Sequence, residues 1–385
     1  RPDSRPGSPR KKKIQQASEE GRISDVSRRS VIWAITILER TVKSKFLLSL
    51  GAVSAFTFAA SPISLAQAPG YHVIHRINTG GEGGWDYITV DTTSNRLFVS
   101  RGTHAMVIDL ARDSVIGDIP NTLGIHGVVL APELNRGFTS NGRDSSVTIF
   151  DYKTLAPIAV VKIPARNPDA ILYDPATRRV FTFNGGTSNA TAIDAANGTV
   201  IGTIDLAGKP ETAVSDGGKI YANIEDKSEI AVFDPKTLTV LARWPLAPCE
   251  EPSGLAIDRA HKRLFAGCGN KTMAIVDMRS GKVVASPTVG AGVDAAGFDP
   301  TTQLAFTSNG EGTITVIHED TPDKYTVVET VPTQRGARTM AVNPKTHRLY
   351  TVTAEFGPAP APTADRPRPR PPMIPGTFVV LELDR

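Results

Sequence analysis

Seven polar positions, one in each of seven repeats of about 40 residues, hold side chains that could do chemistry together. They are four carboxylates, a histidine, a serine and an arginine: Asp86, His126, Asp169, Glu211, Ser253, Asp294 and Arg338. A carboxylate or a histidine can accept a proton or hold a cation, and an arginine can hold an anion. Packing alone does not require such a set, so we expect a binding site. The alternative is a water-filled channel lined with solvated side chains.

A second polar set follows the second apolar run of each repeat. It holds the positions three residues past an aromatic landmark: Arg101, Asn141, Asn184, Ile224, Cys268, Asn309 and Thr353. Asn-Gly recurs at three of these positions. A role in turns is the alternative to a role in binding, because Asn and Gly tolerate positive φ. Further polar residues fall in nearby loops: His104, Glu250, Glu251 and Glu311. The predicted ligand-binding residues are Asp86, Arg101, His104, His126, Asn141, Asp169, Asn184, Glu211, Glu250, Glu251, Asp294, Asn309 and Arg338.

The repeat that positions these residues has two independent landmarks. An aromatic residue lies in its second apolar run, at Phe98, Phe138, Phe181, Tyr221, Phe265, Phe306 and Tyr350. A polar residue closes its third run, at Asp109, Asp151, Asp194, Asp234, Asp277, His318 and Glu382. Each complete copy has four runs of about five residues, rich in β-branched and aromatic types, with turn signals between them. A period near 40 with four short strands predicts a β-propeller blade.

The strand order fixes which loops share a face of such a propeller. The first strand of a blade runs from one face to the other and the second strand returns. The start of strand one and the loop between strands two and three therefore lie on one face, called here the upper face. Because the first strands line the axial channel, the seven polar positions would surround its mouth, called here the upper mouth.

The seventh repeat lacks its fourth run. Its first three runs lie at 339–343, 348–353 and 378–383, and no fourth follows them. Residues 71–80 match the fourth run of the third repeat, 198–208. The sequence therefore predicts an all-β fold, a seven-bladed β-propeller closed by the N-terminal strand in the last blade, which leaves no unpaired edge at the seam.

Residues 71–385 resemble the YVTN-repeat, YncE-like β-propellers of bacterial envelopes. The resemblance rests on runs that end in V-x-V-I/F-D, followed by a T-x-x-V turn and the P-[DE]-x-A start of the next repeat. It implies the propeller fold. Relatives in this family include binding proteins, surface-layer modules and lactonase-type enzymes, and DNA binding is reported for some of them, so the fold does not carry the function.

The segment before the repeats predicts export. Residues 1–41 are polar and basic and are expected to be a disordered or untranslated leader. From Val42 the chain has a basic start, an apolar run over 46–60 and a small-x-small motif at Ser64-Leu65-Ala66. These features predict a signal peptide over 42–66, a propeller over 67–385, and a periplasmic or secreted protein without a transmembrane helix after cleavage. An uncleaved membrane anchor is the alternative.

The charge balance argues against nucleic acid as a partner. The whole chain has 43 basic and 39 acidic residues, a net charge of +4. Removing the 12 basic and 5 acidic residues of 1–66 leaves 31 and 34, a net of −3. A weakly acidic body lacks the basic footprint of a DNA-binding protein. We expect a small polar ligand or an envelope protein as partner, and a monomer.

Two cysteines, Cys249 and Cys268, flank the first two strands of the fifth repeat. Antiparallel pairing would bring both to one edge of the blade, and a disulfide is the natural state in an exported protein. Free thiols or a metal site are the alternatives. No Cys-x-x-Cys-His motif attaches a haem, and the histidines are too scattered for a three-histidine zinc site. The cofactor is therefore undetermined, with a divalent cation held by the carboxylates as one candidate.

A proline-rich insertion, residues 357–376, interrupts the seventh repeat between its second and third runs. Its composition favours an extended polyproline conformation on the upper face. One interpretation is a solvated insertion. The alternatives are a stiff basic flap over the acidic mouth, carrying Arg366, Arg368 and Arg370, or a docking site for a partner.

The function expected first is an exported binding or scaffold protein of the envelope that recognises a small polar ligand or a partner protein at the upper mouth. The enzyme alternative is a lactonase-type hydrolase, with or without a metal ion. In it Glu211 or Asp169 would be the base, His126 the acid or a ligand, and Arg338 would hold a substrate anion. A quinoprotein dehydrogenase comes third. Because no nucleophile is identifiable, we prefer the binding function to the two enzyme functions.

Overall fold

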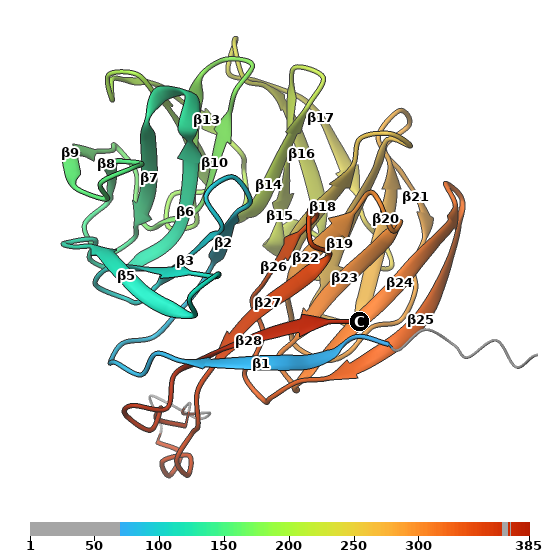
Figure 1. The fold of residues 1–385 in the computed structure, drawn as a ribbon. Helices are drawn as coiled ribbons and strands as arrows, with labels where there is room; N and C mark the ends of the chain where they lie inside the picture. Colours follow the sequence, from blue (N-terminus) through green and yellow to red (C-terminus); the bar gives the residue numbers. More distant parts are fainter. Residues whose placement is uncertain (1–69, 364–368, 370) are drawn as a thin grey trace, which may run out of the picture. The chain divides into compact units, whose positions relative to one another are not determined.

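A computed structural model describes residues 70–363, 369 and 371–385. The predicted leader (1–41) and signal peptide (42–66) lie outside these residues. Within them the fold is all-β (Figure 1), and the helical segments are two single 3₁₀ turns, Pro132–Leu134 and Glu225–Lys227. None of the described helices is long and apolar enough to cross a membrane.

The strands form seven four-stranded antiparallel sheets, called here blades 1 to 7. Blade 1 contains β2 (Ile88–Asp91), β3 (Arg96–Ser100), β4 (Ala105–Asp109) and β5 (Ser114–Ile119). Blade 2 contains β6 (Ile125–Ala131), β7 (Arg136–Asn141), β8 (Ser146–Asp151) and β9 (Pro157–Lys162). Blade 3 contains β10 (Pro168–Asp174), β11 (Arg179–Asn184), β12 (Asn189–Asp194) and β13 (Val200–Asp205). Blade 4 contains β14 (Pro210–Asp216), β15 (Lys219–Ile224), β16 (Glu229–Asp234) and β17 (Thr239–Pro245).

The remaining blades follow the same plan, with the last one assembled from both ends of the repeat region. Blade 5 contains β18 (Pro252–Asp258), β19 (Arg263–Cys268), β20 (Thr272–Asp277) and β21 (Lys282–Ala285). Blade 6 contains β22 (Val293–Asp299), β23 (Leu304–Asn309), β24 (Thr313–Thr321) and β25 (Lys324–Pro332). Blade 7 contains β26 (Met340–Asn343), β27 (Arg348–Thr353), β28 (Val379–Asp384) and β1 (His72–Asn78).

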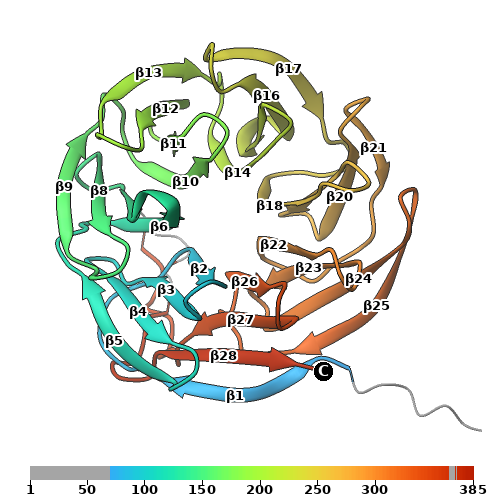
Figure 2. The ribbon, with the colours of Figure 1, turned by 45° about the horizontal axis from the view of Figure 1, so that its top comes forward.

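The predicted closure of the ring is confirmed. Strand β1 pairs antiparallel with β28, from His72 opposite Asp384 to Asn78 opposite Val379. In Figure 2, β1 lies outside β28 on the rim of the ring. Tyr71, just before β1, is 3% exposed and packs edge-on against Phe306 of blade 6, with 5.5 Å between ring centroids. The N-terminal strand is therefore tied to two blades.

The aromatic landmarks of the repeat form the core between blades. All seven are at most 4% exposed, as packing against neighbouring blades requires. The fourth strands form the outer rim of the ring in Figure 2, and side chains on them such as Ile74, Ile158 and Leu241 are exposed. Apolar side chains therefore fill the space between neighbouring sheets.

The predicted disulfide is present. Cys249 and Cys268 are bonded, with 5.6 Å between their Cα atoms, and both are buried. Cys268 ends β19, opposite Pro252 at the start of β18. The bond ties the loop before blade 5 to the second strand of that blade.

The proline-rich insertion leaves blade 7 between β27 and β28, as predicted. Its base is held by one bridge between Phe356 and Met373 and by a hydrogen bond from the Ile374 N–H to the Glu355 carbonyl. Phe356 also packs against Trp85, with ring centroids 6.0 Å apart. The three arginines of the expected basic flap, at 366, 368 and 370, lie outside the described residues.

Candidate functional site

The seven predicted mouth residues lie at the start of the first strand of each blade. Figure 2 shows these strands innermost in the ring. In blades 2 to 6 the register slips by one residue where the mouth residue lies, for example between Ile125 and Val128, which flank His126. A β-bulge of this kind re-aims a side chain and is common next to binding sites.

Serine side chains of the second strands hold the backbone of several mouth positions. The Ser140 hydroxyl donates to the Asp169 carbonyl, and the Ser308 hydroxyl donates to the Arg338 carbonyl. In each case the serine belongs to the preceding blade. The position of a mouth residue therefore depends on the blade that precedes its own.

His126 lies between two of the carboxylates. Its Nδ1 is 2.7 Å from Asp86 Oδ2 and 3.4 Å from Asp169 Oδ1, and its Nε2 is 3.3 Å from Asn167 Oδ1. Burial lowers the pKa of His126, but the hydrogen bond to Asp86 and the charges of Asp169 and Asp86 outweigh it and raise the pKa to about 8. The imidazole is therefore held in its protonated form near neutral pH.

Arg338 joins the other side of the same cluster. Its Nη1 donates to Asp294 Oδ2 at 3.0 Å, and its Nη2 is 3.8 Å from Asp86 Oδ1. Ser253 donates its hydroxyl to the Asp294 carbonyl at 3.0 Å. Polar contacts thus run continuously through six of the seven predicted positions, from Ser253 to Asp169.

Glu211, the seventh position, is held from a different direction. Its Oε1 is 2.7 Å from Lys209 Nζ, and Tyr87 donates its hydroxyl to Oε2 at 3.3 Å. Lys209 also pairs with Glu225. Only 8% of Glu211 is exposed, so this carboxylate lies deeper than its counterparts.

Three of the mouth carboxyl groups have raised pKa values. Burial raises the pKa of Asp169 to about 6, although His126 opposes the shift. Burial likewise raises the pKa of Asp294 to about 6, against the charge of Arg338. Burial and the charge of Asp169 raise the pKa of Glu211 to about 7. Acidic groups held this close together and shielded from water are typical of functional sites.

The second predicted set does not reach the mouth. Asn141, Asn184 and Asn309 are at most 1% exposed and bond within their own blades, where each amide Nδ2 donates to side chains of the third strand. None of the three has positive φ, so the turn explanation is wrong as well. Arg101 is fully buried over the Phe378 ring and donates to the Gly80 and Glu82 carbonyls, so its role is structural.

The predicted loop residues lie apart from the cluster. His104 Nε2 is 3.7 Å from Asp118 on the outer strand of blade 1. Glu250 and Glu251 precede blade 5, where the backbone carbonyls of both accept from the Gly269 N–H. Glu311 accepts from Thr313. Among the described residues, none of these side chains has a recorded contact with His126, Asp86 or Arg338.

A pocket of about 420 Å³ opens beside the cluster, lined by Trp85, Asp86, His126, Arg143 and Asn167 among others. Several glycines line it too, including Gly102, Gly124 and Gly142. A second cavity of about 400 Å³ lies along the first strands of blades 1 to 4. The mouth therefore offers both charged groups and space for a small molecule.

Sequence reasoning missed Asn167, Lys209 and Arg143. A signal for Asn167 exists, because it stands two residues before a mouth position, where four other blades have a glycine, Gly84 in blade 1 among them. Asn167 resembles the other three, Gly124, Gly292 and Gly336, in its backbone. Asn167 and these three glycines have positive φ, which explains the preference for glycine or asparagine. The asparagine adds an amide to the pocket where those blades have no side chain.

The comparisons with known proteins agree with the architecture. No family model matches the chain. The chain is 24% identical over 230 residues to "Uncharacterized protein YncE" of Salmonella typhi, and the match covers 58% of this chain and 56% of that protein. The chain thus spans about half the length of this curated relative. The match and the seven blades together support the YncE-like β-propeller family, as the sequence predicted.

Two solved structures share the fold. "Kuenenia stuttgartiensis Hydrazine Synthase" has a TM-score of 0.61 at 16% identity, covering 70% of this chain and 92% of that one. "Crystal Structure of Mitotic Checkpoint Complex" has a TM-score of 0.65 at 13% identity, covering 82% and 96%. At these identities the likeness concerns the fold alone. A β-propeller binding or scaffold protein is consistent with the match to YncE and with the fold.

Proposed function

We propose that this YncE-like propeller is an exported binding protein whose upper mouth recognises a small polar ligand. The observation that carries the proposal is the cluster of Asp86, His126 and Asp169, linked through Arg338 to Asp294. Five charged or titratable groups, each from a different blade, meet there. Solvated channel lining would not need contacts as short as the 2.7 Å between His126 and Asp86.

The charge of the mouth defines the ligand class. Its carboxylates are Asp86, Asp169, Glu211 and Asp294, and its cations are His126, Lys209 and Arg338. Lys209 also pairs with Glu225, so the four carboxylates outnumber the three cations available to them. A ligand rich in hydroxyl or amine donors, with zero or positive net charge, would satisfy these oxygens.

The size of the adjoining pocket supports a small molecule. Its volume of about 420 Å³ lies within the range of ligand pockets. Trp85 supplies an aromatic wall, and its position against Phe356 links the pocket to the base of the proline-rich insertion. A partner protein is the other candidate occupant, and it would bury the insertion as well as the mouth.

Export is part of the proposal and rests on two features. The segment 42–66 has the pattern of a signal peptide. The Cys249–Cys268 disulfide suits an oxidising compartment. Cell fractionation with a C-terminal tag tests this part separately.

A hydrolase of the lactonase type is the second candidate, because ligand atoms of Asp86, His126 and Asp169 lie within 4.8 Å of one another and could hold a metal ion. Binding leads because Ser253, the hydroxyl of the ring, donates at 3.0 Å to the Asp294 carbonyl, whereas the Asp294 carboxylate lies at the longer distance of 3.5 Å.

A thermal-shift screen of amines, polyols, sugars and lactones against the full chain tests the proposal. Each compound that shifts the melting temperature is then incubated with the protein and followed for turnover. Stabilisation without turnover supports binding. Turnover that requires a metal supports the hydrolase.

A further inference from the structure

Two residues on the lower face, the face opposite the upper mouth, depart from the repeat and meet between blades 5 and 6. The first is in the turn between strands one and two, three residues after the acid or amide that ends strand one. Blades 1, 3, 6 and 7 have a hydroxyl residue at that position: Ser94, Thr177, Thr302 and Thr346. Ser94 and Thr177 donate to the acid that ends strand one. Blade 5 has His261 instead.

The second residue that departs from the repeat comes directly after the residue that closes strand three. Six blades have a buried apolar, aromatic or proline residue there: Leu110, Tyr152, Ala195, Pro235, Met278 and Leu383. Blade 6 has Glu319, which is 1% exposed. A carboxylate is seldom buried so completely without a partner of opposite charge.

The junction of blades 1 and 2 shows how a polar residue at this position can be paired with the acid of the preceding blade. There Tyr152 of blade 2 donates its hydroxyl to Asp91 Oδ2 of blade 1 at 2.6 Å. At the junction of blades 5 and 6, Glu319 replaces the tyrosine and Asp258 corresponds to Asp91. An ionised carboxylate only accepts hydrogen bonds, so Glu319 cannot donate to Asp258 as Tyr152 donates to Asp91.

The atoms of this cluster converge on one point. His261 Nδ1 lies 2.8 Å from Asp258 Oδ2 and 3.2 Å from Glu319 Oε1, and the ligand atoms of all three residues lie within 4.8 Å. Glu319 Oε1 accepts from the Tyr325 hydroxyl at 3.3 Å, whereas Glu319 Oε2 has no hydrogen-bond partner among the described residues. Ligand atoms that surround one ion at about 2.0–2.2 Å lie about 3 Å from each other, which matches these separations.

The nearest arginine does not neutralise the pair. Arg263, in the same turn, donates to Asp277 at 2.9 Å and to Asp323 at 2.8 Å. Its counterpart in blade 1, Arg96, instead reaches Asp91 at 3.4 Å. Burial and then the charge of Asp258 raise the pKa of Glu319. A bound cation would remove this penalty.

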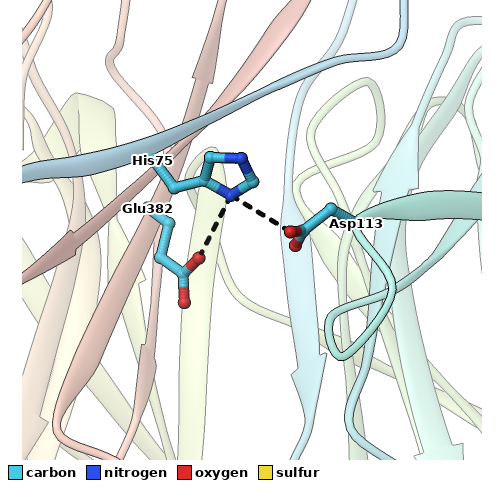
Figure 3. Close-up of side chains that lie close together, drawn as sticks. All are labelled: His75, Asp113 and Glu382. Carbon is cyan, nitrogen blue, oxygen red and sulfur yellow. Dashed lines mark ion pairs between the residues drawn. The ribbon is translucent and has the colours of Figure 1, made fainter.

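A similar trio at the seam of the ring shows the difference. His75, Asp113 and Glu382 lie together in Figure 3, with His75 Nδ1 3.3 Å from Asp113 and 3.8 Å from Glu382. Here Glu382 Oε1 accepts from Arg348 at 2.8 Å and from the Tyr350 hydroxyl at 3.1 Å. This trio already has its cation, so it serves as a natural control.

We propose that Asp258, His261 and Glu319 bind one divalent transition-metal ion of the Zn²⁺ class between blades 5 and 6. One imidazole nitrogen with two carboxylates is a zinc-type donor set, whereas Ca²⁺ takes oxygen ligands. The His261 side chain is 36% exposed, so ions can enter and water can complete the coordination. The ion stabilises the contact between the two blades.

Zinc titration of the full chain, stripped with a chelator, tests the proposal by calorimetry and melting. The mouth also holds a histidine–carboxylate trio, so all proteins carry His126→Asn to remove it. In this background we expect one equivalent of Zn²⁺ to bind and to raise the melting temperature. His261→Thr, which restores the hydroxyl of the repeat, and Glu319→Gln should abolish both effects. His75→Thr should keep them.

Two outcomes overturn the proposal: the His126→Asn protein binds no Zn²⁺, or His261→Thr and Glu319→Gln bind it as that protein does. In the first case Glu319 is a buried neutral acid that shares a proton with Asp258. Glu319→Leu, which restores an apolar residue as in Leu383 of blade 7, keeps the test decisive if Glu319→Gln does not fold. Because the mouth trio is absent throughout, failure here leaves the proposed function untouched.

Discussion

Nδ1 of His126 lies 2.7 Å from Oδ2 of Asp86, although the two residues begin the first strands of neighbouring blades. The contact exists because both strands line the axis and because the bulge in β6 turns His126 toward the channel. Through Asp169 on one side and Arg338 on the other, it connects four blades. The upper mouth is thus one coupled electrostatic unit.

Removal of the closing strand should unfold the propeller. Deletion of residues 71–80 exposes the edge of β28 and the side chains that Tyr71 and Ile77 cover. We expect insoluble or aggregated protein, because an open sheet edge recruits other chains. Solubility and circular dichroism of the truncated protein give the result.

Two substitutions in β1 test the closing contacts without shortening the chain. Ile77 is 3% exposed and Ile74 is 42% exposed, so Ile77→Ala should cost about 2–4 kcal/mol and Ile74→Ala should cost far less. Urea unfolding measures both. Equal costs, or a soluble deletion with an unchanged melting temperature, would show that β1 does not close the ring.

The disulfide should stabilise blade 5. Its two cysteines are 19 residues apart, and the loop it closes is worth about 3 kcal/mol in a chain-entropy account. Replacement of both Cys249 and Cys268 by alanine should lower the stability by about that amount. Non-reducing peptide mapping of exported protein should show the linked pair, and two alkylatable thiols there would refute it.

Stability should depend on pH through the mouth carboxyl groups. Folding raises the pKa of Asp169 and of Asp294 to about 6. The folded protein then binds more protons than the unfolded chain between about pH 4 and 6, so the free energy of unfolding should fall as the pH rises through this window.

Asp169→Asn isolates this effect, because an amide does not titrate. The variant should show a shallower decrease in stability from pH 4 to 6 than the wild type, measured by urea unfolding. Asp118→Asn, at a carboxylate that is 51% exposed, is the control and should leave the slope unchanged. A wild-type slope in Asp169→Asn would mean that Asp169 titrates as an ordinary solvated acid.

The fold was predictable because the sequence repeats with a period of about 40 residues. The aromatic of strand two and the acid of strand three recur in register, and the missing fourth strand reappears at residues 71–80. The mouth positions followed from the same alignment. The contacts between the mouth side chains did not follow from the alignment. Those of His126 depend on a bulge and on the neighbouring blade.

The errors have a common cause. Asn141 and its equivalents were assigned by their place near a loop, yet their amides satisfy hydroxyl groups of the third strand inside the blade. The meeting of His261 with Glu319 was equally hidden, because each belongs to a different repeat.

The central claim, a ligand site at the upper mouth, is tested most directly by ligand-induced melting shifts in His126→Ala and Glu211→Ala. Neither substitution opens an apolar cavity, so each variant should melt close to the wild type but lose the shift produced by a compound from the screen. His104→Ala, on the same face but apart from the cluster, should keep the full shift. If both mouth variants also keep it, the ligand binds elsewhere and the ring of charges only lines the channel.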